Sequence, residues 1–362
     1  VTSNRLISNL LILLVILLLF VLLGVQTAFS QEARWTLIPT DPQNTPGPRY
    51  AHGLVYDSNR SVVILFSGIR ASMIPDESWA DTWEWDGRIW HTLSGSGPVR
   101  YGFGMAFDPE RNVTLLYGGY NHVSESIDLK TYAAVTWAWD GKEWKGIDFA
   151  DSAPRVGAAL VYIPERRCVI RHGGSDGRPA KNNIKNDTWQ WNGTAWIKIA
   201  TGPARAFHKL VYDSIRDTVL LFGGVDQTGS APGDTWEFDG ANWIQVTTEG
   251  PEGRELPGFA FDESRGAAVL YGGAHWYSAA NHFLHNDTWE WDGLQWTLIP
   301  GSDPGYAYMT DMAYDSRRKQ IVLFRGSGSD TNPKPDNLIF IQETWEYGVV
   351  TSGIPRRIWE GQ

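Results

Sequence analysis

One ten-residue stretch decides the fold: Asp81-Thr82-Trp83-Glu84-Trp85-Asp86-Gly87-Arg88-Ile89-Trp90. Variants of this stretch recur along the chain, and a shortened one stands near its end. The first tryptophan of each copy lies at position 83, 137, 189, 236, 289 or 345, so the steps are 54, 52, 47, 53 and 56 residues. A period near fifty residues with an aromatic signature is typical of a ring or array of repeated β-sheets.

Each repeat predicts four short strands. In the first repeat, residues 53–57 are rich in β-formers, and residues 62–66 are apolar throughout, as expected of a strand buried on both faces. Paired glycines follow the second strand in most repeats and leave room for a close backbone approach. The third strand alternates, Asp86-Gly87 is a hairpin signal, and Trp90 opens the fourth strand. Six such units predict an all-β, six-bladed β-propeller with four antiparallel strands in each blade.

The two ends of the repeat region predict how the ring closes. The sixth copy stops at Trp345-Glu346-Tyr347-Gly348 and lacks the turn and last tryptophan of the other copies. Residues 34–39 match residues 295–300 almost residue for residue. We therefore expect the segment from Trp35 to supply the outer strand of the last blade, because this pairing removes an open sheet edge. The propeller is thus predicted at residues 31–348, followed by a tail at residues 349–362.

The first 30 residues have a different character. Arg5 precedes an apolar run from Leu10 to Val25, and Ala28-Phe29-Ser30 supplies small residues two apart. This order predicts a secretory signal peptide. The run is slightly short for a spanning helix of about 20 residues, so an uncleaved membrane anchor at residues 10–25 is the alternative. Either way we expect an exported protein in the periplasm, outside the cell or on its surface.

Charge and cysteine content narrow the class of protein. The net charge of −10 argues against a nucleic-acid partner, which requires a basic surface to neutralise phosphates. Cys168 is the single cysteine, so the chain forms no internal disulfide. An exported protein without disulfides favours a bacterial source.

The combination of Arg…His, Gly-Gly and Trp-Asp…Trp in each unit resembles kelch repeats, as found in galactose oxidase and in the sialic acid epimerases of the bacterial periplasm. The resemblance covers nearly all of the chain after residue 30. The third strand reads Trp-x-Trp-Asp-Gly where the usual kelch pattern has Tyr-Asp, which places the chain in a variant, bacterial branch. Kelch propellers include enzymes and pure adaptors, so the resemblance implies a fold without assigning a function.

The face that carries the long loops is the candidate binding face. In a four-stranded blade, the loop after the second strand and the crossing into the next blade emerge together, whereas the opposite face has short turns. Binding residues usually lie on variable loops held by a rigid scaffold. The long loops are predicted at residues 69–80, 120–135, 175–186, 225–233, 274–286 and 327–342.

Five arginines follow a proline at the crossings between blades: Arg49, Arg100, Arg155, Arg205 and Arg254. The aligned residue of the sixth blade is Ala307. The arginines form a partial cationic collar that could clamp the carboxylate of an acidic sugar through bidentate hydrogen bonds. The alternative is structural, with each arginine bonded to loop carbonyls of the neighbouring blade.

Other candidates lie on the inner strands and on the fifth long loop. His52 and His208 occupy equivalent positions near the channel mouth and could serve acid–base chemistry, although the kelch pattern itself often places a histidine there. Trp276 and Tyr277 suit an amphipathic contact with a protein or glycan, and the alternative is a loop folded on its own aromatic side chains. Asp311 and Lys209 are unusual charges for inner strands and are expected to face the channel.

No cofactor or metal is expected. A set of histidines on two long loops could be read as metal ligands, but no acidic or cysteine partner stands at a supportive spacing. The set comprises His122, His282 and His285. Galactose oxidase chemistry is expected to need a cysteine cross-linked to a tyrosine, whereas Cys168 lies in an apolar second strand as a buried thiol.

These observations favour a non-catalytic scaffold that recognises a protein or a cell-envelope glycan through its variable-loop face. The alternative is an enzyme acting on a carboxylated sugar, such as an epimerase or mutarotase, with the arginine collar and a channel histidine at the axis.

Overall fold

The computed structural model describes residues 33–70, 79–95, 97–120, 135–147, 154–176, 183–278, 281–301, 304–307, 309–329 and 339–349. Residues Trp35–Tyr347 form one compact unit, and the two chain ends form a second unit, of which only residues 33, 34, 348 and 349 are described. The predicted signal or anchor in residues 1–30 lies outside the described residues. Within the described ranges, no helix has the length and apolarity that a membrane crossing requires.

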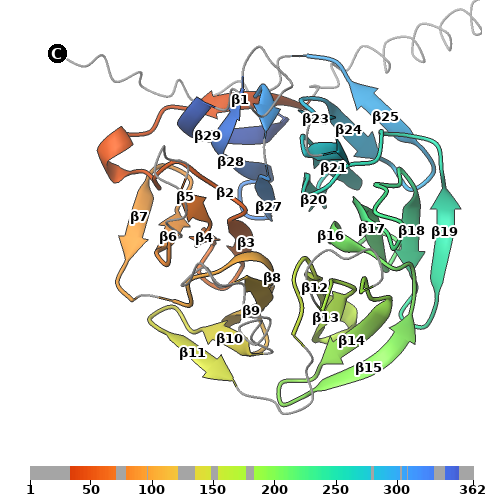
Figure 1. The fold of residues 1–362 in the computed structure, drawn as a ribbon. Coiled ribbons are helices and arrows are strands. Elements are labelled where there is room, and N and C mark those ends of the chain that lie inside the picture. The colour runs from red at the N-terminus through yellow and green to blue at the C-terminus, as the bar shows by residue number, and fades with distance from the viewer. Residues whose placement is uncertain are drawn as a thin grey trace, which may run out of the picture. The chain divides into compact units, whose positions relative to one another are not determined.

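The compact unit is a six-bladed β-propeller, as the repeat predicts (Figure 1). Its first blade consists of β3 (Gly53–Asp57), β4 (Val62–Phe66), β6 (Thr82–Trp85) and β7 (Trp90–Leu93), paired in that order. The next two blades are β8 (Tyr101–Asp108), β9 (Val113–Tyr120), β10 (Thr136–Trp139) and β11 (Trp144–Ile147), then β12 (Ala159–Ile163), β13 (Cys168–His172), β14 (Asp187–Trp191) and β15 (Trp196–Thr201). Blades 4 and 5 are β16 (Ala206–Asp213), β17 (Thr218–Val225), β18 (Thr235–Phe238) and β19 (Trp243–Thr247), then β20 (Gly258–Asp262), β21 (Ala267–Tyr271), β24 (Thr288–Trp291) and β25 (Trp296–Ile299).

The sixth blade joins the two ends of the repeat region. It comprises β27 (Asp311–Asp315), β28 (Gln320–Ser329), β29 (Ile339–Val349) and, on its outer side, β1 (Ala33–Ile38). A short strand, β26 (Tyr306–Ala307), also pairs with β28. The N-terminal strand at Trp35 therefore closes the last blade, which confirms the prediction from the sequence match.

The second strand of each blade forms the core. In β4, every residue from Val62 to Phe66 is buried, as its uninterrupted apolar sequence predicts. One cluster packs Leu54, Val63 and Leu65 of blade 1 against Val322 and Phe324 of blade 6. The core is thus a series of interfaces between neighbouring sheets.

Tryptophans bind each blade to the one before it. The indole N–H of Trp144, which begins β11, donates to the buried hydroxyl of Thr82 in β6 at 3.0 Å. The same bond joins all six pairs of neighbouring blades, at Trp35–Thr288, Trp90–Thr344, Trp144–Thr82, Trp196–Thr136, Trp243–Thr188 and Trp296–Thr235. The repeated Trp and Thr of the motif are therefore the donor and the acceptor of one hydrogen bond that connects neighbouring blades.

Paired glycines form a second connection between neighbouring blades. Gly119 donates its backbone N–H to the carbonyl of Arg155 in the next blade at 2.8 Å. A Cβ at Gly118, where φ is +78°, would meet that carbonyl oxygen at 2.2 Å. The position therefore demands glycine for space as well as for conformation. In blade 1 a serine replaces the first glycine, and its hydroxyl donates to the carbonyl of Arg100 at 2.6 Å.

The face with short turns is fixed by arginines of the first hairpin. Arg111 pairs with Asp108 at 2.7 Å in its own blade and reaches the carbonyl of Asn192 in the next blade. Arg166 reaches the carbonyl of Asp239 at 2.6 Å in the same way. The hairpin arginines of blades 1, 5 and 6 pair instead with a glutamate in the third strand of their own blade, in the pairs Arg60–Glu84, Arg265–Glu290 and Arg318–Glu346.

Candidate binding face and axial channel

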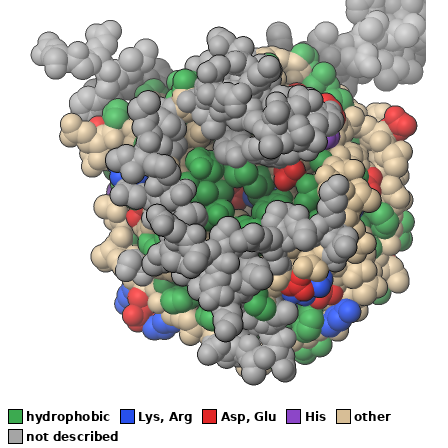
Figure 2. Space-filling model, in the orientation of Figure 1, with side chains coloured by type: hydrophobic (Ala, Val, Ile, Leu, Met, Phe, Trp, Pro, Cys, Tyr) green, Lys and Arg blue, Asp and Glu red, His purple; other side chains and the backbone are tan. Residues whose placement is uncertain are grey.

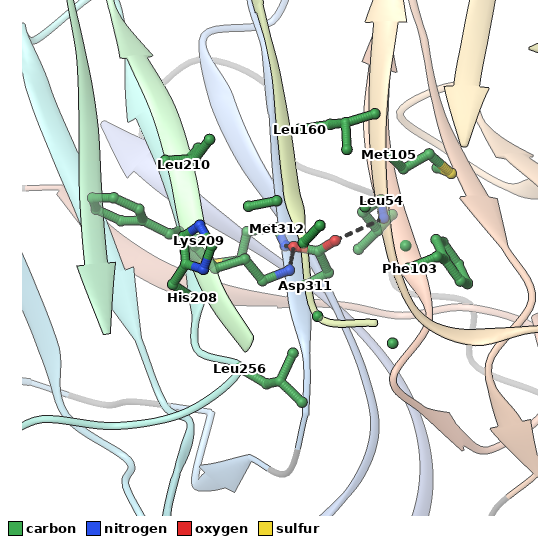
Figure 3. Close-up of a pocket in the computed structure, with 17 residues that line it drawn as sticks. Leu54, Phe103, Met105, Leu160, His208, Lys209, Leu210, Leu256, Asp311 and Met312 are labelled. Carbon is green, nitrogen blue, oxygen red and sulfur yellow. Dashed lines mark hydrogen bonds and ion pairs between the residues drawn. The ribbon is translucent and has the colours of Figure 1, made fainter. Parts of the chain in front are cut away.

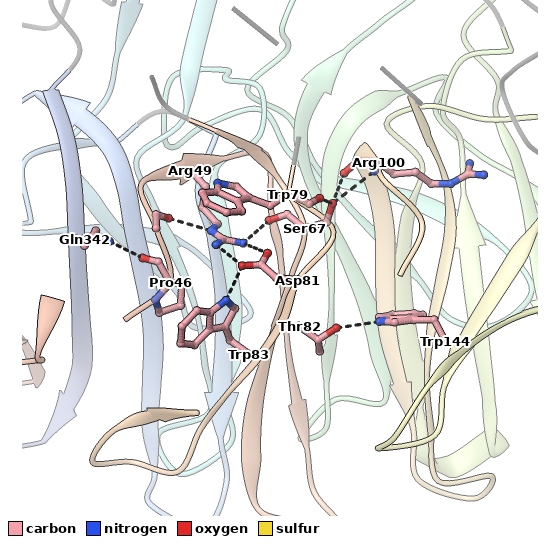
Figure 4. Close-up of polar contacts among 11 residues, drawn as sticks. Pro46, Arg49, Ser67, Trp79, Asp81, Thr82, Trp83, Arg100, Trp144 and Gln342 are labelled. Atoms are coloured by element: carbon pink, nitrogen blue, oxygen red, sulfur yellow. Dashed lines mark hydrogen bonds and ion pairs between the residues drawn. The ribbon is translucent and has the colours of Figure 1, made fainter. Parts of the chain in front are cut away.

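The crossing arginine of blade 1 is enclosed in a polar network (Figure 4). Arg49 is fully buried. Its guanidinium donates to both carboxylate oxygens of Asp81 at 2.7 and 2.9 Å and to the carbonyl of Ser67 at 2.9 Å. The indole N–H of Trp83 donates to the same carboxylate at 2.6 Å. Asp81 therefore accepts from an arginine and from the tryptophan two residues after it.

Three other crossing arginines are held in the same way. Each is buried and pairs with the acid that stands directly before the motif threonine of its own blade, in the pairs Arg155–Asp187, Arg205–Asp234 and Arg254–Asp287. The tryptophan two residues after each acid also donates to it, at 2.7 to 2.8 Å. Burial favours protonation of Asp187, but the Trp189 hydrogen bond and the Arg155 charge outweigh it and lower the pKa of this carboxyl. The predicted collar is thus internally neutralised at these blades.

Blade 6 reaches the same arrangement from different residues. Its crossing residue is the buried Ala307, and its acid is Glu343. Arg325, in β28, donates to Glu343 at 2.9 Å, and so does the indole of Trp345 at 2.9 Å. A second-strand arginine therefore replaces the missing crossing arginine.

Blade 2 departs from the pattern. Val135 occupies the position of the acid, and the buried Arg100 donates only to the carbonyl of Gly118, at 3.2 Å. No described residue supplies a carboxylate to its guanidinium. Of the five predicted crossing arginines, Arg100 alone lacks an acidic partner among the described residues.

The two predicted histidines are buried neutral side chains. His52 and His208 are 5% and 3% exposed, and neither ring nitrogen of His208 has a hydrogen-bond partner among the described residues. His52 packs edge-on against Phe324, and His208 packs edge-on against His172. Burial, reinforced by nearby positive charges, lowers the pKa of both imidazoles well below the ordinary value.

An ion pair lies in the axial channel (Figure 3). Lys209 Nζ in β16 is 2.6 Å from Asp311 Oδ1 in β27, and Asp311 Oδ2 accepts from the backbone N–H of Leu54 in β3 at 3.1 Å. Blades 4, 6 and 1 are therefore connected across the axis. The surrounding cavity has a volume of about 90 Å³ and includes His208 in its wall, whereas His52 is not part of that wall. Hydrophobic side chains gather around the central hollow in Figure 2.

The fifth long loop contains a β-hairpin. β22 (Ala274–Ser278) pairs with β23 (Asn281–Leu284). Trp276 and Tyr277 lie in this hairpin, but their side chains are outside the described part, so their role in binding stays a prediction. His275 lies 2.7 Å from the carbonyl of Gly253, which connects the hairpin to the crossing before blade 5.

Glu255 lies beside this hairpin and was not singled out from the sequence. Its backbone forms a bridge with Ala274, and no described residue donates to its carboxylate. Burial raises the pKa of this carboxyl to about 7. Sequence patterns give no signal for it, because the burial arises from the contact between the crossing and the hairpin.

The metal and cysteine candidates are described only in part. His122 and the side chain of His282 lie outside the described residues, and His285 is buried. Within the described ranges, no group of three or more histidine, cysteine or acidic side chains is placed to hold a metal. Cys168 is buried, and burial raises the pKa of its thiol.

The acidic partners of the arginines were missed at the level of sequence, although a signal existed. Asp81, Asp187, Asp234, Asp287 and Glu343 all stand directly before the threonine of the repeated motif. Only the ring shows that each of them meets a buried arginine.

Neither the models of known protein families nor the curated protein sequences give a match to this chain. The chain is therefore described by its architecture, as a six-bladed β-propeller of four-stranded antiparallel blades.

Proposed function

We propose that the chain is an exported, kelch-like binding scaffold that recognises a protein or a cell-envelope glycan through its long-loop face. The observation that carries this proposal is the packing of the axis. The cavity there is about 90 Å³ and contains an internal Lys209–Asp311 ion pair. Pockets that enclose small-molecule substrates are typically about 300–1,000 Å³. Recognition spread over the loops fits this geometry better than turnover in an axial pocket.

The long loop of blade 4 has internal hydrogen bonds and a contact with the neighbouring loop. In the loop at residues 226–234, the Asp226 carboxylate accepts from the backbone of Thr228 at 2.8 Å and of Ser230 at 3.1 Å. The amide of Gln227 in the same loop donates to the carbonyl of Ile184 in blade 3 at 3.3 Å. The loops of blades 3 and 4 are therefore connected to each other on this face.

The kelch-like assignment and the export are supported by the sequence. The crossing arginines, glycine pairs and tryptophans of the repeat each have a defined place in the ring, as a kelch-like pattern requires. Arg5, the apolar run at residues 10–25 and the small residues at 28–30 support export by a signal peptide or retention by an anchor.

The side chains at the axis and the crossing arginines do not favour the alternative function, an enzyme acting on a carboxylated sugar. His208 is neutral and buried, and four of the five crossing arginines are already paired with internal carboxylates. An axial reaction would require the Lys209–Asp311 pair to open.

A pair of matched variants tests the loop-face proposal in the full chain. One replaces residues 226–233 with a Gly-Ser segment of equal length, and the other replaces the turn at Ala241 and Asn242 on the opposite face with Gly-Ser. Binding is measured on immobilised neutral and acidic oligosaccharides and on cell-envelope proteins. The proposal predicts that the loop variant loses binding and that the turn variant keeps it. Equal binding by the two variants, or sugar turnover that Lys209→Met abolishes, would overturn the proposal.

A further inference from the structure

Blade 2 places two buried donors at a position where no described residue supplies a carboxylate. In the other five blades, one acid accepts from an arginine and from the tryptophan two residues after it. In blade 2 the corresponding donors are Arg100 and Trp137, and the residue in the acid's place is Val135. The indole N–H of Trp137 and Nε of Arg100 are buried, and neither has a hydrogen-bond partner among the described residues.

The Arg100 guanidinium shares one backbone bond with the crossing arginines of blades 1 and 5, which do contain the acid. Its Nη1 donates to the carbonyl eighteen residues further along, Gly118, at 3.2 Å. Arg49 and Arg254 make the same bond, to Ser67 at 2.9 Å and to Gly272 at 3.1 Å. Arg49 and Arg254 also donate from Nε to a backbone carbonyl two residues earlier, whereas Nε of Arg100 has no partner among the described residues. Arg100 thus keeps the Nη1 bond and has further N–H groups that no described residue accepts from. Figure 4 shows the contrast: Arg49 lies within a network, and the Arg100 guanidinium extends away from it.

The charge makes a missing partner costly. Arg100 is 5% exposed, and burial lowers the pKa of its guanidinium. An arginine nevertheless remains protonated near neutral pH, so it cannot relieve the penalty by losing its proton. A buried cation without a partner is strongly unfavourable, and a carboxylate with two oxygens matches the guanidinium fork and an indole donor together.

We propose that blade 2 binds a carboxylate group from outside the chain, held by Arg100 and the indole N–H of Trp137. One carboxylate oxygen accepts from the guanidinium, and the other accepts from the guanidinium and the indole, as Asp81 does in blade 1. The site lies at a crossing on the long-loop face, so it rests on the proposed function and adds a chemical group to it. A carboxylated sugar and an acidic side chain of a protein both offer this group.

The test follows the indole resonance of Trp137 in the ¹⁵N-labelled full chain. Trp137→Phe assigns that resonance among the indole signals. Sodium acetate, D-glucuronate and N-acetylglutamate amide are titrated at constant ionic strength, with D-glucose as the neutral control. The proposal predicts a downfield shift of this one indole signal with the carboxylates and none with glucose. A stronger response to glucuronate identifies a sugar source, and a stronger response to the glutamate derivative identifies a protein source.

Val135→Asp is the decisive variant, because it gives blade 2 the internal acid of the other blades. It should shift the Trp137 resonance without any ligand, raise the melting temperature by a few degrees, and abolish the response to acetate. Val135→Asn has a similar size without the charge and should keep the response. A Trp137 signal that ignores all three carboxylates in the wild type, or a Val135→Asp variant that still responds as the wild type does, would overturn the proposal. Neither result affects the oligosaccharide and protein binding measured for the loop variants.

Discussion

Blades 1 and 2 bury the same arginine against the same carbonyl position, yet only blade 1 supplies a carboxylate to it. Asp81 accepts from Arg49 and Trp83, whereas Val135 leaves Arg100 and Trp137 without that acceptor. Arg49 in blade 1 belongs to a structural ion pair, and Arg100 in blade 2 is the centre of the proposed carboxylate site. Comparing the repeats within one chain therefore points to a candidate binding site in the blade whose arginine network lacks its acid.

Replacing the acid of blade 1 with the valine of blade 2 should have the largest effect on stability. Asp81→Val removes the acid partner of a fully buried arginine and the acceptor of the Trp83 indole. Loss of one partner from a buried pair costs about 3–5 kcal/mol, so the free energy of unfolding should fall by that amount in urea titration. Asp81→Asn, which keeps an acceptor, is the matched control and should lose less. A change below about 1 kcal/mol for the valine variant would mean that backbone carbonyls suffice for a buried arginine, and blade 2 would then need no ligand.

Blade 5 offers the converse case, a half-buried acid without a cation. Glu255 has its pKa raised by burial from 4.5 to about 7 in the folded chain. Between these values the folded state binds more protons than the unfolded state, so the contribution of Glu255 to stability decreases as pH rises from about 4.5 to about 7. At pH 8, Glu255→Gln should be more stable than the wild type by on the order of 2–3 kcal/mol, and at pH 4 the difference should vanish.

The difference in stability between Glu255→Gln and the wild type separates the effect of Glu255 from that of the buried histidines. Burial lowers the pKa of His172 from 6.5 to about 4, so its contribution is full above pH 6.5 and decreases as pH falls toward 4. That opposite trend is present in both proteins and cancels. A stability difference that does not change between pH 4 and pH 8 would show that the Glu255 carboxyl is solvated.

The hydrogen bond between blades 1 and 2 should give the smallest effect. Thr82→Val removes the hydroxyl that accepts from the Trp144 indole at 3.0 Å and keeps the shape of the side chain. A buried donor left without its partner costs about 1–3 kcal/mol, so the melting temperature should fall by a few degrees. Thr92, in the outer strand of the same blade, is exposed and provides a matched Thr→Val control. Equal melting temperatures for the two variants would show that packing alone holds the blades together.

Much of the fold was predictable from the sequence. The spacing of the tryptophans indicated six blades, and the match between residues 34–39 and 295–300 indicated the closing strand. Both features could be predicted because each is a short sequence pattern that fits only one place in a ring of blades. The packing role of the repeated tryptophans was also predictable from their size and position.

The candidate site was predictable only in part. The crossing arginines were visible as a set, but their partners stand 29 to 33 residues away and meet them only when each blade folds. Lys209 and Asp311 are 102 residues apart and come from different blades, so no local pattern connects them. The sequence shows that Val135 stands where the other repeats have an acid. Only the structure shows that this acid is the partner of a buried arginine.

The most direct measurement of the difference between the blades is the free energy of unfolding of Val135→Asp in buffer without carboxylates. Hydrogen bonds to charged groups contribute about 1.5–3 kcal/mol, so a new aspartate between Arg100 and Trp137 should stabilise the chain by that order. The control Val135→Asn should show little of this gain. If Val135→Asp is no more stable than the wild type, Arg100 and Trp137 gain nothing from a carboxylate at this position, and the proposed carboxylate site in blade 2 is wrong.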